Sequence, residues 1–142
     1  MKMSLLAIAG LLTLLVAALH VGCIIFGADW YRFLGAGEQM AQLAENGDVY
    51  PTVITSIIVG VFLIWSAYAF SGAGVIGRLP FTKTVLSLIC FVLLTRALGF
   101  YFLMPIFPEN SLTFWWVSSG ACMVLGLTYL VGLWRSWEYL GQ

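Results

Sequence analysis

The stretch from residue 5 to residue 26, LLAIAGLLTLLVAALHVGCIIF, decides the fold class. It contains no Asp, Glu, Lys or Arg, and most of its residues are aliphatic. About 20 apolar residues in a helix are enough to cross the ~30 Å hydrocarbon core of a bilayer. A secretory signal also begins with a basic residue and an apolar run. Here the run continues through Ile24, Ile25 and Phe26 without a polar boundary, so we interpret it as a retained membrane span.

Three further apolar runs have the same character and lie at about residues 52–70, 85–105 and 114–134. The composition agrees, because 62% of the 142 residues are hydrophobic and only 8% are charged. These values lie far from those of a soluble domain. The sequence therefore predicts a single all-α domain over residues 1–142, an integral membrane four-helix bundle with spans of about 5–26, 52–70, 85–105 and 114–134.

The charged residues between the runs predict an orientation. Basic residues precede the first run, separate the second from the third and follow the fourth: Lys2, Arg78, Lys83 and Arg135. The other two connections hold one basic residue, Arg32, among five acidic ones: Asp29, Glu38, Glu45, Asp48 and Glu109. Because basic loops remain in the cytoplasm, both termini are predicted to be cytoplasmic. We expect the membrane to be the bacterial inner (plasma) membrane.

The connection between the first two runs is unusually long for a compact protein and has a helical pattern. Over residues 30–46, apolar residues recur at spacings of three and four, which predicts a short amphipathic interfacial helix. The firmer part is expected over Glu38–Glu45, since Asn46-Gly47 supplies a helix stop. Its polar face carries mainly acids, which favours a lid over the bundle or contact with a partner. The alternative is a structured loop that shields helix ends.

Arg96 is the residue that most strongly indicates a site. It lies inside the third predicted span, where a charge costs about 2.5–3.5 kcal/mol on insertion scales. His20, Thr55, Ser56, Ser118 and Ser119 are predicted at a similar depth in the outer half of the other spans.

The spans contain no carboxylate, so the candidates to neutralise Arg96 are Glu38 or Asp29 from the loop, or an anionic ligand. The predicted ligand site comprises residues from all four spans and from the loop: Arg96, His20, Glu38, Thr55, Ser56, Ser118 and Ser119. The competing interpretation is that Arg96 extends to lipid headgroups, while the hydroxyls bond to helix backbones.

Several classes of function lack support in the residues. The six basic and six acidic residues cancel, which removes the electrostatic basis for binding nucleic acid. One histidine and three separated cysteines, Cys23, Cys90 and Cys122, provide no haem or metal site within one chain. No catalytic triad or intramembrane carboxylate pair is present, so we expect no catalytic residues, although enzymatic chemistry is not excluded.

The leading hypothesis is a non-catalytic module that binds a lipid or small ligand, or an accessory subunit of a membrane complex. One alternative is a redox component that binds quinone between Arg96 and His20; another is an oligomeric channel or transporter subunit. No cofactor is required, and a bound lipid or quinone, partner membrane subunits or further copies of the chain are the expected partners. In size and topology alone, the chain resembles several small membrane families, including the DoxX-like proteins.

Overall fold

The structure is a computed structural model that describes residues 4–34, 37–108 and 110–140. All regular structure in these ranges is helical, which confirms the predicted all-α class. The helices are α1 (Leu5–Phe26), α2 (Ala28–Leu34), α3 (Glu38–Glu45), α4 (Tyr50–Gly72), α5 (Thr82–Leu98), α6 (Phe100–Leu103), α7 (Leu112–Arg135) and α8 (Trp137–Leu140).

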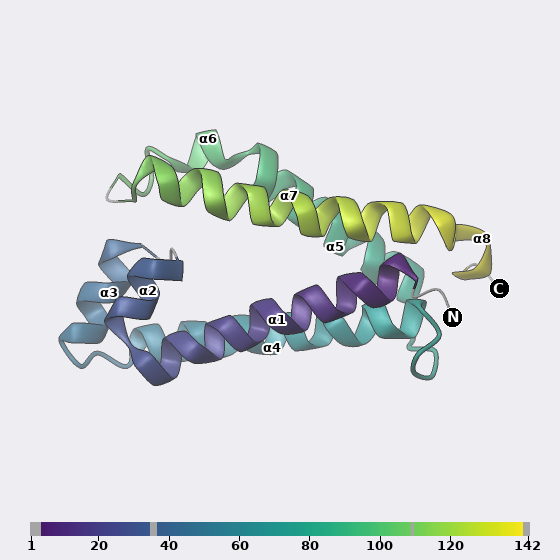
Figure 1. Ribbon diagram of the computed structural model, residues 1–142, viewed down its shortest axis with the longest axis horizontal. Helices are drawn as coiled ribbons and strands as arrows, with labels where there is room; N and C mark the ends of the chain where they lie inside the picture. Colours follow the sequence, from purple (N-terminus) through teal and green to yellow (C-terminus); the bar gives the residue numbers. More distant parts are fainter. Residues whose placement is uncertain (1–3, 35–36, 109, 141–142) are drawn as a thin grey trace.

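The long helices form two antiparallel pairs, α1 with α4 and α5 with α7 (Figure 1). The pairs meet at the end of the molecule where the N- and C-termini lie, and they diverge toward the end that carries α2 and α3. Small residues permit the close approach: a Cβ atom on Gly132 of α7 would lie 3.0 Å from the backbone nitrogen of Leu6 in α1. Such close backbone approach is typical of helix packing in membranes.

A single buried cluster joins the two pairs. Leu6 of α1, Leu86 and Ile89 of α5 and Tyr129 of α7 are 1% exposed or less. Within this cluster the hydroxyl oxygens of Thr13 and Tyr129 lie 2.7 Å apart. The Thr13 hydroxyl also lies 2.7 Å from the Ala9 carbonyl, and the Tyr129 hydroxyl lies 3.5 Å from the Trp65 carbonyl. The Thr13–Tyr129 bond connects the middle of α1 to the last third of α7.

Local signals in the sequence set the helix ends. The Ser4 hydroxyl accepts from the Ala7 amide at the start of α1, and Gly27 ends the helix with a φ of 82°. Ser111 caps α7 in the same way, by accepting from the Phe114 amide. Helix α3 spans Glu38–Glu45, as predicted from the amphipathic pattern and the Asn46-Gly47 stop, and α2 precedes it as a second short helix.

The third predicted segment differs most from its expected form. Instead of one helix over 85–105, α5 begins at Thr82 and ends at Leu98, and α6 continues after Gly99. The amide of Gly99 donates to the Thr95 carbonyl at 2.7 Å, and its ψ of 8° turns the chain out of the helix. Glycine is a weak helix former, so the break falls at Gly99, and α6 then ends at Leu103, two residues before Pro105.

The outer surface of the long helices is apolar. Helices α1, α4 and α7 are each long and apolar enough to cross a membrane. Large hydrophobic side chains on these helices remain exposed, among them Leu15 at 56%, Ile57 at 59% and Val124 at 60%. Water does not favour such a surface, whereas lipid chains do. The fourth long helix, α5, has 17 residues and packs against α7.

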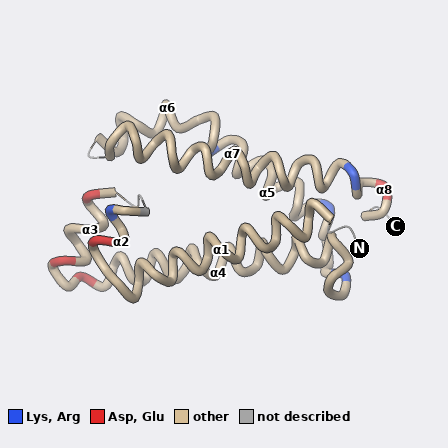
Figure 2. The backbone as a smooth tube through the Cα atoms, viewed as in Figure 1, with Lys and Arg blue, Asp and Glu red and all other residues tan. Residues whose placement is uncertain are grey.

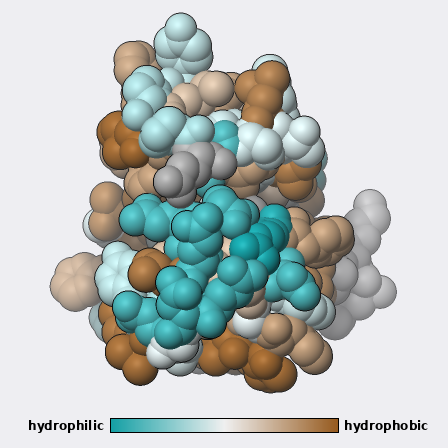
Figure 3. Space-filling view, turned by 90° about the vertical axis from the view of Figure 1, so that its left-hand side faces the viewer, coloured by the Kyte–Doolittle hydropathy of each residue, from teal (hydrophilic) through white to brown (hydrophobic). Residues whose placement is uncertain are grey.

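Apart from Arg96, the charged residues of the described ranges lie at the two ends of the helix pairs (Figure 2). Around α2 and α3 the described residues hold four carboxylates and one guanidinium: Asp29, Glu38, Glu45, Asp48 and Arg32. At the opposite end, the described residues include three basic side chains and one acid: Arg78, Lys83, Arg135 and Glu138. The end with α2 and α3 is covered by hydrophilic side chains, with hydrophobic ones around them (Figure 3).

Candidate functional site

Arg96 lies two residues before the end of α5 and joins that helix to α7. One terminal nitrogen donates to the Ser119 hydroxyl at 3.0 Å, and the other donates to the Ser118 hydroxyl at 2.7 Å. The guanidinium carbon is 5.3 Å from the centre of the Trp115 ring. The structure therefore brings together three of the seven predicted site residues, and Trp115 adds a cation–π contact.

No carboxylate neutralises Arg96 among residues 4–34, 37–108 and 110–140. Both hydroxyl partners are neutral. Ser118 and Ser119 lie six and seven residues after Leu112, which is roughly 10 Å from the first residue of α7 at 1.5 Å per residue. Arg96 is thus a partly buried cation within an apolar helix pair, held by uncharged groups.

His20 is placed by its own helix and by α4. Its Nδ1 lies 2.7 Å from the Val16 carbonyl, which can only accept, so Nδ1 carries a proton. The imidazole also packs on the Phe62 ring, with 5.2 Å between the ring centres. No hydrogen bond or ring contact joins His20 to Arg96 in the described part of the chain. The two residues belong to different helix pairs.

The two α4 residues of the predicted site have different surroundings. Thr55 is 3% exposed, and its hydroxyl lies 3.1 Å from that of Tyr31 in α2. Ser56 is exposed and donates to the Thr52 carbonyl of its own helix at 2.7 Å. Thr55 therefore fixes α2 against α4, whereas Ser56 bonds to a backbone carbonyl of its own helix.

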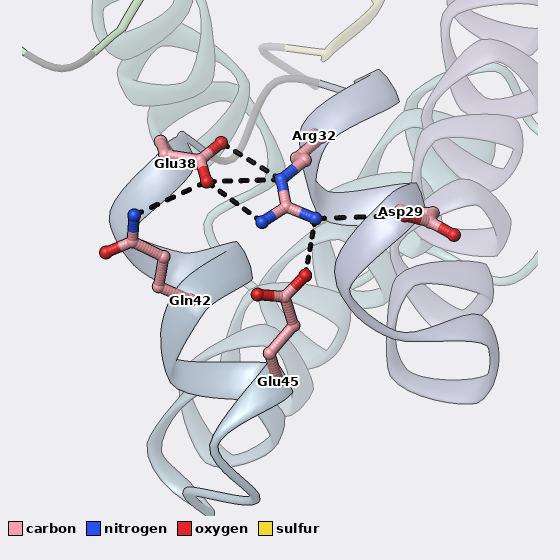
Figure 4. Close-up of polar contacts among 5 residues, drawn as sticks. All are labelled: Asp29, Arg32, Glu38, Gln42 and Glu45. Atoms are coloured by element: carbon pink, nitrogen blue, oxygen red, sulfur yellow. Dashed lines mark hydrogen bonds and ion pairs between the residues drawn. The ribbon is translucent and has the colours of Figure 1, made fainter.

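Glu38 lies in a cluster that holds α2 and α3 together, and not beside Arg96 (Figure 4). The Arg32 Nε donates to both Glu38 oxygens, at 3.2 and 3.0 Å, and one terminal nitrogen donates to Glu45 at 2.7 Å. Asp29 lies at the edge, 3.8 Å from Arg32. Hydrogen bonds from Arg32 lower the pKa of Glu38 and of Glu45, and those carboxylates raise the pKa of Arg32.

A cavity of about 350 Å³ lies at the polar end, between α3, the start of α4 and the segment before α7. Its described lining residues are uncharged: Gly37, Gln39, Met40, Leu43, Tyr50, Ile106, Phe107, Pro108 and Asn110. None of the predicted site residues belongs to this lining. The cavity and the Arg96 cluster are separate features of the same half of the molecule.

Five residues of these clusters were not among the predicted site residues: Trp115, Tyr31, Arg32, Glu45 and Asp29. Trp115 stands three positions before Ser118, on the same face of α7, and this spacing could have indicated its contact with Arg96. Glu38 and Glu45 are seven positions apart and so share a helix face that one guanidinium can bridge. The Tyr31–Thr55 contact depends on how the α1–α2 turn directs the chain, which no local pattern specifies.

The described residues contain no group of three or more His, Cys, Asp or Glu side chains that could hold a metal ion. Comparison with protein-family models, with curated proteins and with solved structures finds no match to this chain. The fold therefore supports a conclusion about the class of protein. Its long apolar helices are those of a small polytopic membrane protein associated with the lipid bilayer.

Proposed function

We propose that the chain crosses the membrane four times and that α5 and α6 together form the third crossing. Helix α5 alone is about 25 Å long, whereas the segment 82–103 is up to about 33 Å long, enough for the ~30 Å hydrocarbon core. The acidic α2–α3 end is the outer one. The basic end, with both termini and the α4–α5 connection, is the cytoplasmic one, in the bacterial inner membrane.

We further propose that the protein is a non-catalytic module that binds a lipid or a small anionic ligand in its outer half. The observation that carries this proposal is the environment of Arg96. Its described partners are two hydroxyls and an aromatic ring, none of which cancels its charge. A cation within an apolar helix pair is costly where no counter-charge lies beside it, and an anionic ligand provides that compensation.

Purification with native lipids, followed by native mass spectrometry, tests this function. The wild-type protein is expected to retain a bound molecule that Arg96→Leu loses. Arg135→Gln, which removes a positive charge at the opposite end, is the matched control and is expected to retain it. An empty wild-type protein that is no more stable than Arg96→Leu would end the proposal.

The same preparation also tests the other predicted roles. An accessory subunit would purify with a stoichiometric partner protein, and a channel subunit would purify as a defined homo-oligomer. A quinone-binding component would retain a quinone that His20→Ala releases. We rank these roles lower, because the described contacts of His20 are with Val16 and Phe62 and not with Arg96.

A further inference from the structure

The Arg96 cluster is rich in hydrogen-bond donors. A guanidinium has five N–H groups, and Arg96 uses one on each terminal nitrogen for the bonds to Ser118 and Ser119. Three N–H groups remain. Each serine oxygen accepts from Arg96 and retains its own O–H for donation. The cluster thus has as many as five donors for a ligand that supplies several acceptor oxygens.

The depth of the cluster fits a ligand held at the boundary between headgroups and chains. Trp116 is 63% exposed and packs on Phe100, with 5.5 Å between the ring centres. Exposed tryptophan marks the interfacial level of a bilayer. Ser118 and Ser119 follow Trp116 by two and three residues, roughly 3–5 Å along the helix. The long Arg96 side chain can reach toward the headgroups from this level.

The surface on both helices beside the cluster is apolar. Val92 lies one turn before Arg96 and is 47% exposed, and Val117 lies beside Ser118 and is 67% exposed. A soluble anion would have to lose its hydration shell to reach the guanidinium across such a surface. A phospholipid reaches it by lateral diffusion, and its acyl chains cover the same apolar side chains.

We infer that Arg96, Ser118 and Ser119 bind the phosphate of an outer-leaflet phospholipid in the seam between α5 and α7. The phosphate oxygens accept from the remaining guanidinium and hydroxyl donors, and Trp115 restrains the guanidinium from the side. This inference rests on the proposed function, since it names the ligand of the same site. The inference is narrower than the proposed function, because it requires that the ligand contains a phosphate and that this phosphate belongs to a lipid.

Titration of delipidated protein in detergent, read by native mass spectrometry and thermal melting, tests the inference. The probes are dimyristoylphosphatidylglycerol, dimyristoylglycerol with the same chains and no phosphate, myristate and inorganic phosphate. We expect the phospholipid alone to bind and to raise the melting temperature. Arg96→Gln is expected to weaken binding roughly tenfold or more, and Arg135→Gln to leave it unchanged.

The remaining outcomes distinguish a failure of the phospholipid inference from a failure of the proposed ligand-binding function. Arg96-dependent binding of inorganic phosphate alone would overturn the lipid source, and Arg96-dependent binding of myristate alone would overturn the phosphate. Either result would leave the proposed ligand-binding function standing. If none of the probes shows binding that depends on Arg96, the inference is overturned. The proposed function itself fails only if native purification also yields no ligand.

If Arg96→Gln does not fold, the double variant Ser118→Ala/Ser119→Ala keeps the charge and removes both hydroxyls. It is expected to bind the phospholipid several-fold more weakly than the wild type. Unchanged affinity in this variant would overturn the role of the hydroxyls in the site.

Discussion

The hydroxyl oxygens of Tyr129, in the last third of α7, and Thr13, near the middle of α1, lie 2.7 Å apart and share a hydrogen bond. Both side chains are 1% exposed or less. They are polar groups inside an apolar core, where an unpaired hydroxyl is costly. The bond therefore specifies how the two helix pairs align along their length.

A double-mutant cycle measures this bond. Tyr129→Phe and Thr13→Val are each expected to destabilise the protein, and the double variant less than the sum of the two. The expected coupling is about 0.6 kcal/mol, the average that double-mutant cycles give for hydrogen bonds between membrane helices. Denaturant unfolding in micelles supplies the free energies. Strict additivity would mean that the bond contributes nothing to stability.

Gly132 is expected to tolerate no large side chain. A Cβ there would lie 3.0 Å from the Leu6 backbone nitrogen and from two atoms of the Leu6 side chain. Gly132→Leu should therefore separate α7 from α1 at a cost of about 1–3 kcal/mol, as for other overpacked cores.

Gly120 of the same helix is the matched control, because a Cβ there meets nothing within 4 Å. Thermal melting in detergent is expected to separate Gly132→Leu clearly from Gly120→Leu. Equal melting temperatures for the two variants would contradict the packing of α1 against α7.

The Arg32 cluster is expected to make the α2–α3 segment sensitive to acid. Arg32 lowers the pKa of Glu38 and Glu45 below the ordinary 4.5, so both bind protons more weakly when folded. Their stabilising contribution is complete above that ordinary value and is lost as the pH falls through the lowered values. Carbon-13 NMR of the two carboxyls should give titration midpoints below 4.5 in the folded protein.

Arg32→Gln is expected to return both midpoints toward the ordinary value. Asp29→Asn should change them little, because Asp29 is 3.8 Å from Arg32 and its side chain is 96% exposed. Wild-type midpoints that do not move in Arg32→Gln would exclude Arg32 as the cause of the shift.

The secondary structure could be predicted from the sequence where local chemistry determines it. The apolar run over Leu5–Phe26 coincides with α1, and the amphipathic pattern with its Asn-Gly stop coincides with α3. The break at Gly99 could not be predicted, because a single glycine in an apolar run is compatible with a continuous helix.

The candidate site was predictable only in part. Depth along the helices placed Arg96 near Ser118 and Ser119, and the structure brings these together. Depth does not specify which face of a helix points inward, so the Val16 partner of His20 and the Arg32 partner of Glu38 were not predicted. The Thr13–Tyr129 bond was missed for the same reason, since both residues lie in apolar runs that indicate only helix packing.

The central claim is that the chain crosses the membrane four times, and α5 with α6 is the crossing that most needs a test. Single cysteines at Asn46, Gly77 and Pro108, in a chain whose three native cysteines are replaced by alanine, report the side of each connection. A membrane-impermeant maleimide applied from outside is expected to label positions 46 and 108 but not 77. Labelling of 77 and 108 from the same side would show that α5 and α6 do not cross.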